Sequence, residues 1–356
     1  MTPGWWLDSS ALPLILREGV GKRRLGVGPL RCLPYSAIFM PHSDTRTLAL
    51  LLIDGFALMS YAALIEPFRA ANMLAGRQLY RWAHISVDGK PVTASNDATI
   101  LADGKVGDPL DCDMLFVFAG GDPSRFTDVA TFAWLRRLAR AQVRIASVSG
   151  GPFLLARAGL LEGHRATIHW EHQAAFLEAF PALAIEPVLY VIDRRRMTCA
   201  GGTAGMDLAI DLIGRDHGPA LAAEVGDWFI RTDPRGADRP QRLSLRERYG
   251  VADERILRVL AAMEASVEEP RDRAALARLA GISMRQLERL FASHFGRSIG
   301  AVHLDIRLAQ AAQLLRATGQ GVTAIAMACG FLSASHFSRA FKARFGHAPA
   351  RERRRR

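Results

Sequence analysis

The sequence predicts two domains, an α/β domain with a mostly parallel sheet followed by an all-α domain that repeats one helical pattern. Apolar runs alternate with helical stretches up to residue 231, whereas every segment after about residue 250 has a helical pattern. Residues 232–250, rich in Pro, Gly and charge, form the expected linker. Charge is also uneven, because residues 241–356 hold 21 Lys and Arg against 10 Asp and Glu, while the preceding 240 residues hold 25 of each. A basic C-terminal third favours a polyanion-binding module.

The α/β domain is expected over residues 45–231. Buried strands are predicted at Leu48–Ile53, Trp82–Val87, Met114–Ala119, Val143–Val148 and Leu189–Ile192. Helices are predicted at Leu58–Leu74, Thr131–Ala141, Gly151–Ala158, Trp170–Ala179, Ala204–Arg215 and Pro219–Ile230. This alternation predicts a parallel sheet in a flavodoxin-like sandwich.

Features of the chain ends and the cysteines limit the class of protein. Residues 1–44 show no sustained period and are expected to be a poorly ordered extension, and residues 351–356 a basic tail. The start lacks the basic region of a signal peptide, and the most apolar stretch, Leu48–Phe68, contains two carboxylates, so we expect a cytoplasmic protein outside the membrane. Cys32, Cys112, Cys199 and Cys329 form no CxxC pair, so we expect no metal site, no disulfide framework and no cofactor.

The all-α domain, expected over residues 251–350, contains a helix-turn-helix pattern. Arg273–Ala280 is a short helix, Gly281-Ile282 forms a turn, and Ser283 is a natural N-cap for the next helix. In that helix Leu287, Leu290, Phe291 and Phe295 form an apolar stripe, and Arg285, Gln286 and Arg289 lie on the opposite face. Arg can pair with guanine and Gln with adenine, so this face is suited to base edges.

The same pattern recurs fifty positions later. A support helix at Thr323–Cys329 and a turn at Gly330-Phe331 precede the cap Ser333, and Phe337, Ala340, Phe341 and Phe345 are expected to face inward. The predicted DNA-binding residues of both units are Ser283, Arg285, Gln286, Arg289, Ser333, Ser335, His336, Arg339 and Lys342. A joining helix at Ile299–Ala317, with Leu304, Leu308, Ala312 and Leu315 inward, would hold the units roughly 34 Å apart, in successive major grooves.

These segments resemble a known family. Arg307–Leu315, Val322–Phe331 and Ser335–Pro349 are similar to the AraC/XylS family of transcriptional regulators, over about residues 253–350. The resemblance implies binding of double-stranded promoter DNA and, usually, activation through RNA polymerase. Ala334 departs from the pattern, because many members carry a polar residue there, so no base contact is expected from it.

The α/β domain contains a strand-to-helix elbow at Ser149, followed by Gly150 and Gly151. Such an elbow exposes a side chain and directs backbone N–H groups at a ligand. The segments Val148–Leu161, Ala166–His172 and Cys199–Asp207 resemble the PfpI-like, class I glutamine amidotransferase-type domain over roughly residues 46–230. The version it is similar to is the one fused to AraC-type regulators, the GlxA type, which includes arginine- and glycine-betaine-responsive members.

The elbow is not expected to be catalytic. Catalytic relatives carry cysteine where this chain has Ser149, and the hydrolase pattern G-x-S-x-G is absent because residue 147 is Ser. A serine needs a base, and His169 with Glu171 offers one, but this pair follows the elbow sooner than an amidotransferase dyad does. We therefore predict no catalytic residues and a pocket used as a sensor.

The ligand pocket is predicted at the carboxyl ends of the strands. Its expected residues are Glu66, Gly120, Gly121, Ser149, Gly150, His169 and Trp170. Backbone N–H groups would hold a carboxylate, and the acid and the aromatic face of Trp170 a cationic group, which suits an amino acid or a betaine-like zwitterion. The competing interpretations are a local partner for Glu66, a structural hydrogen bond for His169 and plain packing for Trp170.

We therefore expect a regulator of transcription, an activator, controlled by a small-molecule effector and working as a homodimer. Two other classes stay open. One is a hydrolase- or amidotransferase-like enzyme with an appended DNA-binding domain, and the other is an architectural DNA binder that senses no ligand.

Overall fold

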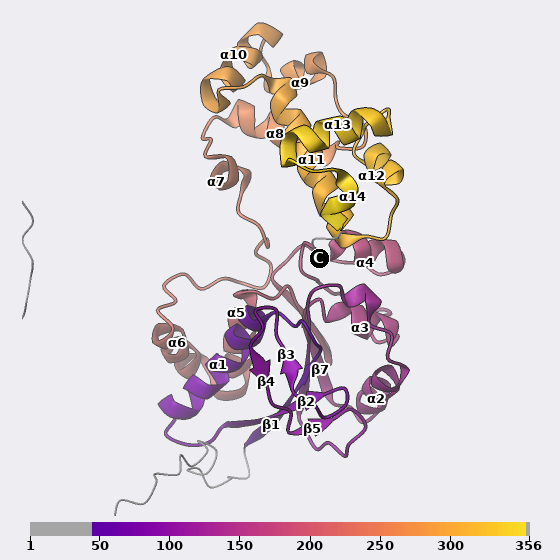
Figure 1. The fold of residues 1–356 in the computed structure, drawn as a ribbon. Helices are drawn as coiled ribbons and strands as arrows, with labels where there is room; N and C mark the ends of the chain where they lie inside the picture. The colour runs from indigo at the N-terminus through magenta and orange to yellow at the C-terminus, as the bar shows by residue number, and fades with distance from the viewer. Residues whose placement is uncertain (1–44, 354–356) are drawn as a thin grey trace, which may run out of the picture. The chain divides into compact units, whose positions relative to one another are not determined.

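The computed structural model describes residues 45–353 (Figure 1). The predicted extension 1–44, with Cys32, and residues 354–356 of the predicted tail lie outside this range.

The α/β domain is built on a sheet with the strand order β5-β2-β1-β6-β7-β9-β8. All its pairings are parallel except the antiparallel pair β8–β9. The strands are β1 Arg46–Leu52, β2 Tyr80–Ser86, β5 Gly104–Lys105, β6 Met114–Ala119, β7 Arg144–Ser149, β8 Tyr190–Asp193 and β9 Arg196–Cys199, with a separate pair β3 Val92–Thr93 and β4 Thr99–Ile100. The predicted parallel-dominated sandwich is confirmed.

Helices cover both faces of this sheet (Figure 1). On one side lie α1 Leu58–Leu74, α5 Ala204–His217 and α6 Pro219–Trp228; on the other lie α2 Val129–Arg140, α3 Pro152–Arg157 and α4 Gln173–Ala179. Strand β1 shows why both faces are covered. Leu48 and Leu50 belong to the first core, and Ala49 and Leu51 to the second, so a continuous apolar run is buried on both sides.

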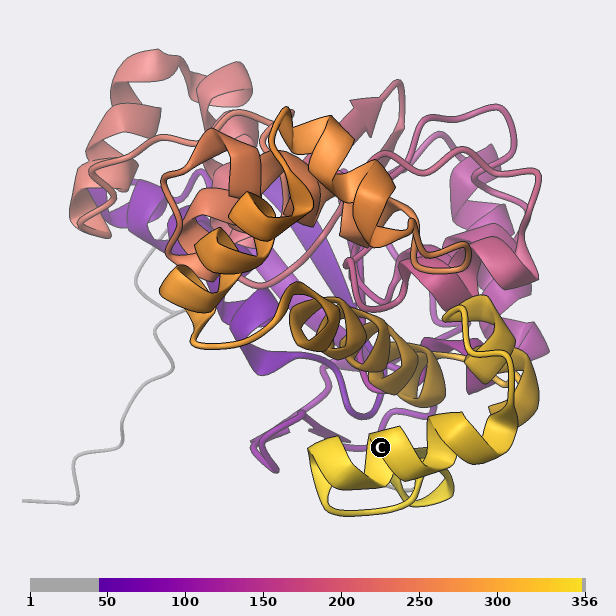
Figure 2. The same cartoon turned by 90° about the horizontal axis from the view of Figure 1, so that it is seen from above.

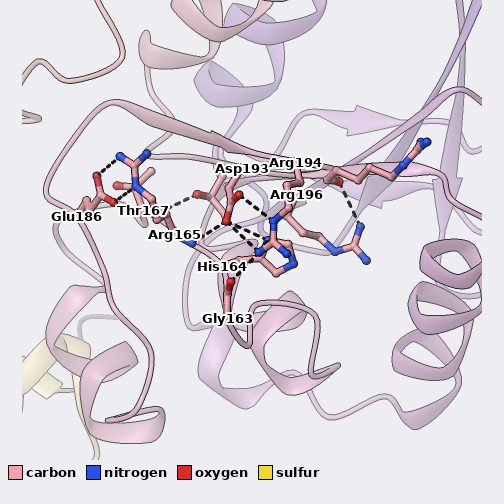
Figure 3. Close-up of polar contacts among 10 residues, drawn as sticks. Gly163, His164, Arg165, Thr167, Glu186, Asp193, Arg194 and Arg196 are labelled. Carbon is pink, nitrogen blue, oxygen red and sulfur yellow. Dashed lines mark hydrogen bonds and ion pairs between the residues drawn. The ribbon is translucent and has the colours of Figure 1, made fainter.

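The β8–β9 hairpin was only half predicted, because the sequence indicated β8 but not its partner. Its turn is held by Asp193, whose carboxylate accepts from the Arg165 backbone N–H at 3.0 Å and contacts His164 Nδ1 at 3.1 Å (Figure 3). The side-chain hydrogen bond from Arg194 is the main reason that the pKa of Asp193 falls to about 2. The hairpin ends the sheet beside β7, the strand that carries the elbow.

The helical domain contains two helix-turn-helix units joined by one long helix. Its elements are α7 Leu245–Tyr249, α8 Glu254–Ala265, α9 Arg273–Ala280, α10 Met284–Phe295, α11 Ile299–Ala317, α12 Val322–Ala328, α13 Ala334–Phe345 and α14 Pro349–Glu352. Figure 2 shows α11 between the orange helices of the first unit and the yellow helices of the second. Leu287 and Phe291 are buried in one core, and Phe337 and Phe341 in another, which confirms the inward stripes.

The first residues of the predicted tail are helical. Residues 351 and 352 belong to α14, and the Glu352 carboxylate is buried against Arg316 and His347. None of the helices in the described part of the chain has the length and apolar character that crossing a membrane requires.

Candidate functional site

The elbow is formed by the last residue of β7. Ser149 is buried and has a φ of +60°, in the left-handed region that residues other than glycine rarely adopt. Gly201 (φ +84°) closes against it, since a Cβ there would lie 2.7 Å from Ser60 Oγ and 2.8 Å from Ser149 Cβ. Only glycine fits this approach, so backbone and two serines form a tightly packed floor.

A hollow opens above this floor, at the carboxyl ends of β6 and β7. Within the α/β domain its walls are Gly55, Ala57, Met59, Ser60, Ser95, Gly120, Gly121, Asp122, Arg125, Ser149, His169, Glu171, His172 and Gly202. The structure therefore brings together four of the predicted ligand residues, Gly120, Gly121, Ser149 and His169. Their position agrees with the general location of ligand sites in open α/β sheets.

The other three predicted residues are not lining residues of this hollow. The Gly150 N–H donates to Ala119 O at 2.9 Å, so it is already used within the fold. The Trp170 N–H donates to Gln241 Oε1 at 2.7 Å, and the ring lies under the Arg242 guanidinium, 5.0 Å from the ring centroid. The aromatic face of Trp170 is thus occupied by a residue of the chain itself.

Glu66 does not lie beside the elbow, so its predicted position is wrong. It lies on the partly exposed side of α1, where its carboxylate accepts from Arg69 Nε at 2.7 Å. The residue beside the elbow is Ser60, about 1.7 helical turns earlier on α1. Ser60 is buried, and its Oγ accepts from the Gly202 N–H at 2.7 Å. Sequence reasoning missed it because a serine within an apolar helix carries no signature of a site.

The hollow contains both signs of charge. Asp122 and Arg125 follow the glycine pair after β6, and Glu171 follows His169. The Asp122 carboxylate accepts from Ser124 Oγ at 2.5 Å, while the Arg125 side chain is exposed. Sequence analysis missed Asp122 and Arg125 because charged residues in a loop are most often solvated surface. Their convergence is visible only once β6 and β7 are placed side by side.

His169 lines the hollow as a neutral imidazole. Burial lowers its pKa, which the nearby Glu171 carboxylate only partly offsets. Its Nδ1 accepts the Glu171 N–H at 3.3 Å, so the proton lies on Nε2 and can be donated to a ligand. The His169 backbone N–H donates to Ser149 O at 3.3 Å, which ties this segment directly to the elbow.

The second candidate surface lies on the two recognition helices, α10 and α13. All nine predicted DNA-binding residues are exposed: Ser283, Arg285, Gln286, Arg289, Ser333, Ser335, His336, Arg339 and Lys342. Ser283 and Ser333 are N-caps, as predicted. Gln286 is also used locally, because its Oε1 accepts the Ser283 N–H at 2.9 Å in a capping box. The capping box uses the oxygen of the Gln286 amide, and the NH₂ group is the donor part of that side chain.

Comparisons with known proteins agree with this arrangement. Residues 46–215 match the DJ-1/PfpI family, and residues 276–355 match a helix-turn-helix domain. The HTH-type transcriptional regulator CdhR of Pseudomonas aeruginosa is 42% identical over 303 residues, 85% of this chain and 90% of the relative. The HTH-type transcriptional regulator GlxA of Rhizobium meliloti is 41% identical over 317 residues, which cover 88% of this chain and 98% of the relative. The HTH-type transcriptional regulator GbdR of Pseudomonas aeruginosa is 40% identical over 310 residues, which cover 87% of this chain and 84% of the relative.

The chain is an AraC-type HTH transcriptional regulator with a DJ-1/PfpI domain. Both resemblances noted in the sequence are thereby confirmed. The regulator belongs with DNA-binding proteins and not with the enzymes that share the α/β fold, as expected.

Proposed function

We propose that the regulator is controlled by a small zwitterionic metabolite, an amino acid or a betaine-like compound, bound in the hollow above Ser149. The observation that carries this proposal is that, within the α/β domain, one hollow at the strand ends is lined by the Arg125 guanidinium, the carboxylates of Asp122 and Glu171, and the imidazoles of His169 and His172. A site with both signs of charge is complementary to a ligand that carries both.

Each end of such a ligand has a suitable partner. The Arg125 guanidinium and His169 Nε2–H would bind the carboxylate, since Arg presents a planar fork of donors. Asp122 and Glu171 would face the cationic end. Gly121, with a φ of +58°, brings backbone to the wall without a side chain. These roles replace those that the sequence suggested for Glu66 and Trp170.

Effector binding would change how the helical domain engages its promoter. The regulator would act as a homodimer in the cytoplasm, place α10 and α13 in successive major grooves, and activate transcription through RNA polymerase. The exposed Arg285 and Arg339 support base reading by both helices.

A thermal-shift screen of the full chain against amino acids and quaternary amines tests the effector, because a ligand that prefers the native state raises the melting temperature. Arg125→Ala should remove the shift and the promoter response to the active compound. Glu66→Gln, outside the hollow, is the control and should keep both. An intact response in Arg125→Ala would exclude this binding mode.

The DNA-binding part is tested separately by enriching duplexes from a random library with the full chain. A shared sequence motif is expected, and enrichment of none would contradict sequence-specific binding.

A further inference from the structure

The segment 231–241, here called the strap, runs back along the α/β domain. Asp207, whose side chain is fully buried, holds both Arg231 and Arg235. Pro240 pairs with Val188, and the Leu189 N–H donates to Ala237 O at 3.1 Å. These contacts fix the strap before its last residue, Gln241.

The Gln241 side chain is bound into the segment that carries His169. Its Oε1 accepts the Trp170 N–H at 2.7 Å, and its Nε2 donates to Ile168 O at 2.9 Å. One carboxamide therefore holds the backbone on both sides of His169, the residue whose ring lines the hollow.

The same Nε2 also lies 3.0 Å from Thr167 Oγ1 and 2.9 Å from Val188 O. Three acceptors share two N–H groups, so the bonding of the amide depends on the position of each acceptor. Leaving a half-buried polar group without a partner is costly. A displacement of the backbone around residue 169 therefore forces the Gln241 amide to change its hydrogen bonds.

The chain continues from Gln241 directly to the DNA-binding domain. Arg242, Leu243 and Ser244 are exposed, and Ser244 caps α7. Helix α7 is tied to α8 by Arg248, which pairs with Glu264 at 2.7 Å. Because the strap is fixed up to Pro240, a movement at Gln241 acts on the residues that follow it, which lead to α7.

We propose that Gln241 is a positioning residue that transmits occupancy of the hollow to the DNA-binding domain. This inference rests on the proposed function, since it takes the hollow as the effector site. An effector that contacts His169 changes which of the three acceptors bind the Gln241 amide. The rearranged amide then changes how residues 242–244, which lead to α7, are positioned.

A double-mutant cycle in the full chain tests this role without requiring a known effector. His169→Ala stands in for a perturbation of the hollow, and it is made in the wild-type and in the Gln241→Ala background. The first readout is hydrogen–deuterium exchange of peptides that cover residues 243–255. The second is the dissociation constant for a duplex that the full chain enriches from a random library.

We expect His169→Ala to change both readouts by about fivefold or more, the lower end of typical allosteric coupling, and to change neither in the Gln241→Ala background. Gln241→Glu should behave like Gln241→Ala, because it keeps the acceptor for Trp170 but loses both donors. The isosteric variant covers the case in which truncation unfolds the strap.

Arg239→Gln is the matched control, since its exposed side chain lies on the same strap, and the effect of His169→Ala should persist in it. Equal effects of His169→Ala in both backgrounds, or none in either, would overturn the proposal, because a merely structural Gln241 lowers stability without coupling. If the chain enriches no duplex, sequence-specific DNA binding fails, while the exchange readout still decides the role of Gln241.

Discussion

The two helix-turn-helix units share the same buried scaffold but differ in their exposed residues. Phe291 and Phe341 occupy equivalent buried positions, and Gly296 and Gly346 end α10 and α13 in the left-handed conformation. The exposed faces differ: Arg285, Gln286 and Arg289 on α10, against Ser335, His336, Arg339 and Lys342 on α13. The buried positions of the repeat set the fold, and its exposed positions are free to read different sequences.

The strongest test of the shared scaffold is Phe291→Ala beside Phe341→Ala. Both rings are fully buried. Each truncation should lower the free energy of unfolding by about 3–5 kcal/mol, through lost burial and a cavity. Urea unfolding followed by circular dichroism measures this. A large loss for one variant only would mean that the two cores are not equivalent.

Arg285→Ala and Arg339→Ala test the difference between the reading faces. Each should cost roughly 1–3 kcal/mol at the cognate site and relax specificity in its own half of that site. Titrations of duplexes with single base-pair changes measure this. If an Arg variant weakens all sequences alike and reduces the salt dependence, that side chain contacts phosphate instead.

The caps provide a finer comparison. Ser283 accepts from the Gln286 N–H within a capping box, whereas Ser333 accepts from the His336 N–H without a reciprocal partner. Alanine at either position should cost about 1 kcal/mol, and more at Ser283, since it removes both the hydrogen bond from the Gln286 N–H and the bond from Ser283 Oγ to Gln286 Oε1. Glycine at each site is the control and should cost a few tenths of a kcal/mol. Equal losses at both sites would argue against any contribution from Gln286.

The smallest expected effect concerns the connection between the units. Asp305 on α11 pairs with Arg297, just after α10, and with Arg344 on α13 at 3.3 Å. Because both arginines are about half exposed, Asp305→Asn should cost less than about 1 kcal/mol of stability. It should weaken binding to a two-part site more than to either half alone. Glu254→Gln, which breaks the exposed pair with Arg246, is the control. The same loss on single half-sites would contradict a role in spacing.

Much of the fold follows from periodicity. Helices α1, α9 and α11 and strand β6 have the predicted bounds, because apolar residues mark each of them and the side-chain caps Asp272 and Ser298 begin α9 and α11. The short strands β3, β4 and β5 and the partner strand β9 were missed, since two to four residues carry no period. They form where neighbouring strands supply hydrogen-bond partners.

The candidate site was less accessible to sequence reasoning. Ser149 could be placed because strand β7 ends there, and His169 because the segment Ala166–His172 resembles the PfpI-like domain. Ser60, Asp122 and Arg125 could not, because they come from a helix and a loop that meet only in three dimensions. Glu66 was predicted beside the elbow because a carboxylate is a typical site residue, whereas the residue of α1 that lies there is Ser60.

The tight contact of Gly201 with Ser60 and Ser149 also suggests how new sensors can be made. The bottom of the cavity is set by main-chain approach and admits no extra atom, whereas its rim consists of replaceable side chains such as Arg125 and Glu171. Variation of the rim can therefore change which metabolite is detected while the scaffold is kept, and libraries for engineered biosensors should leave the glycine untouched.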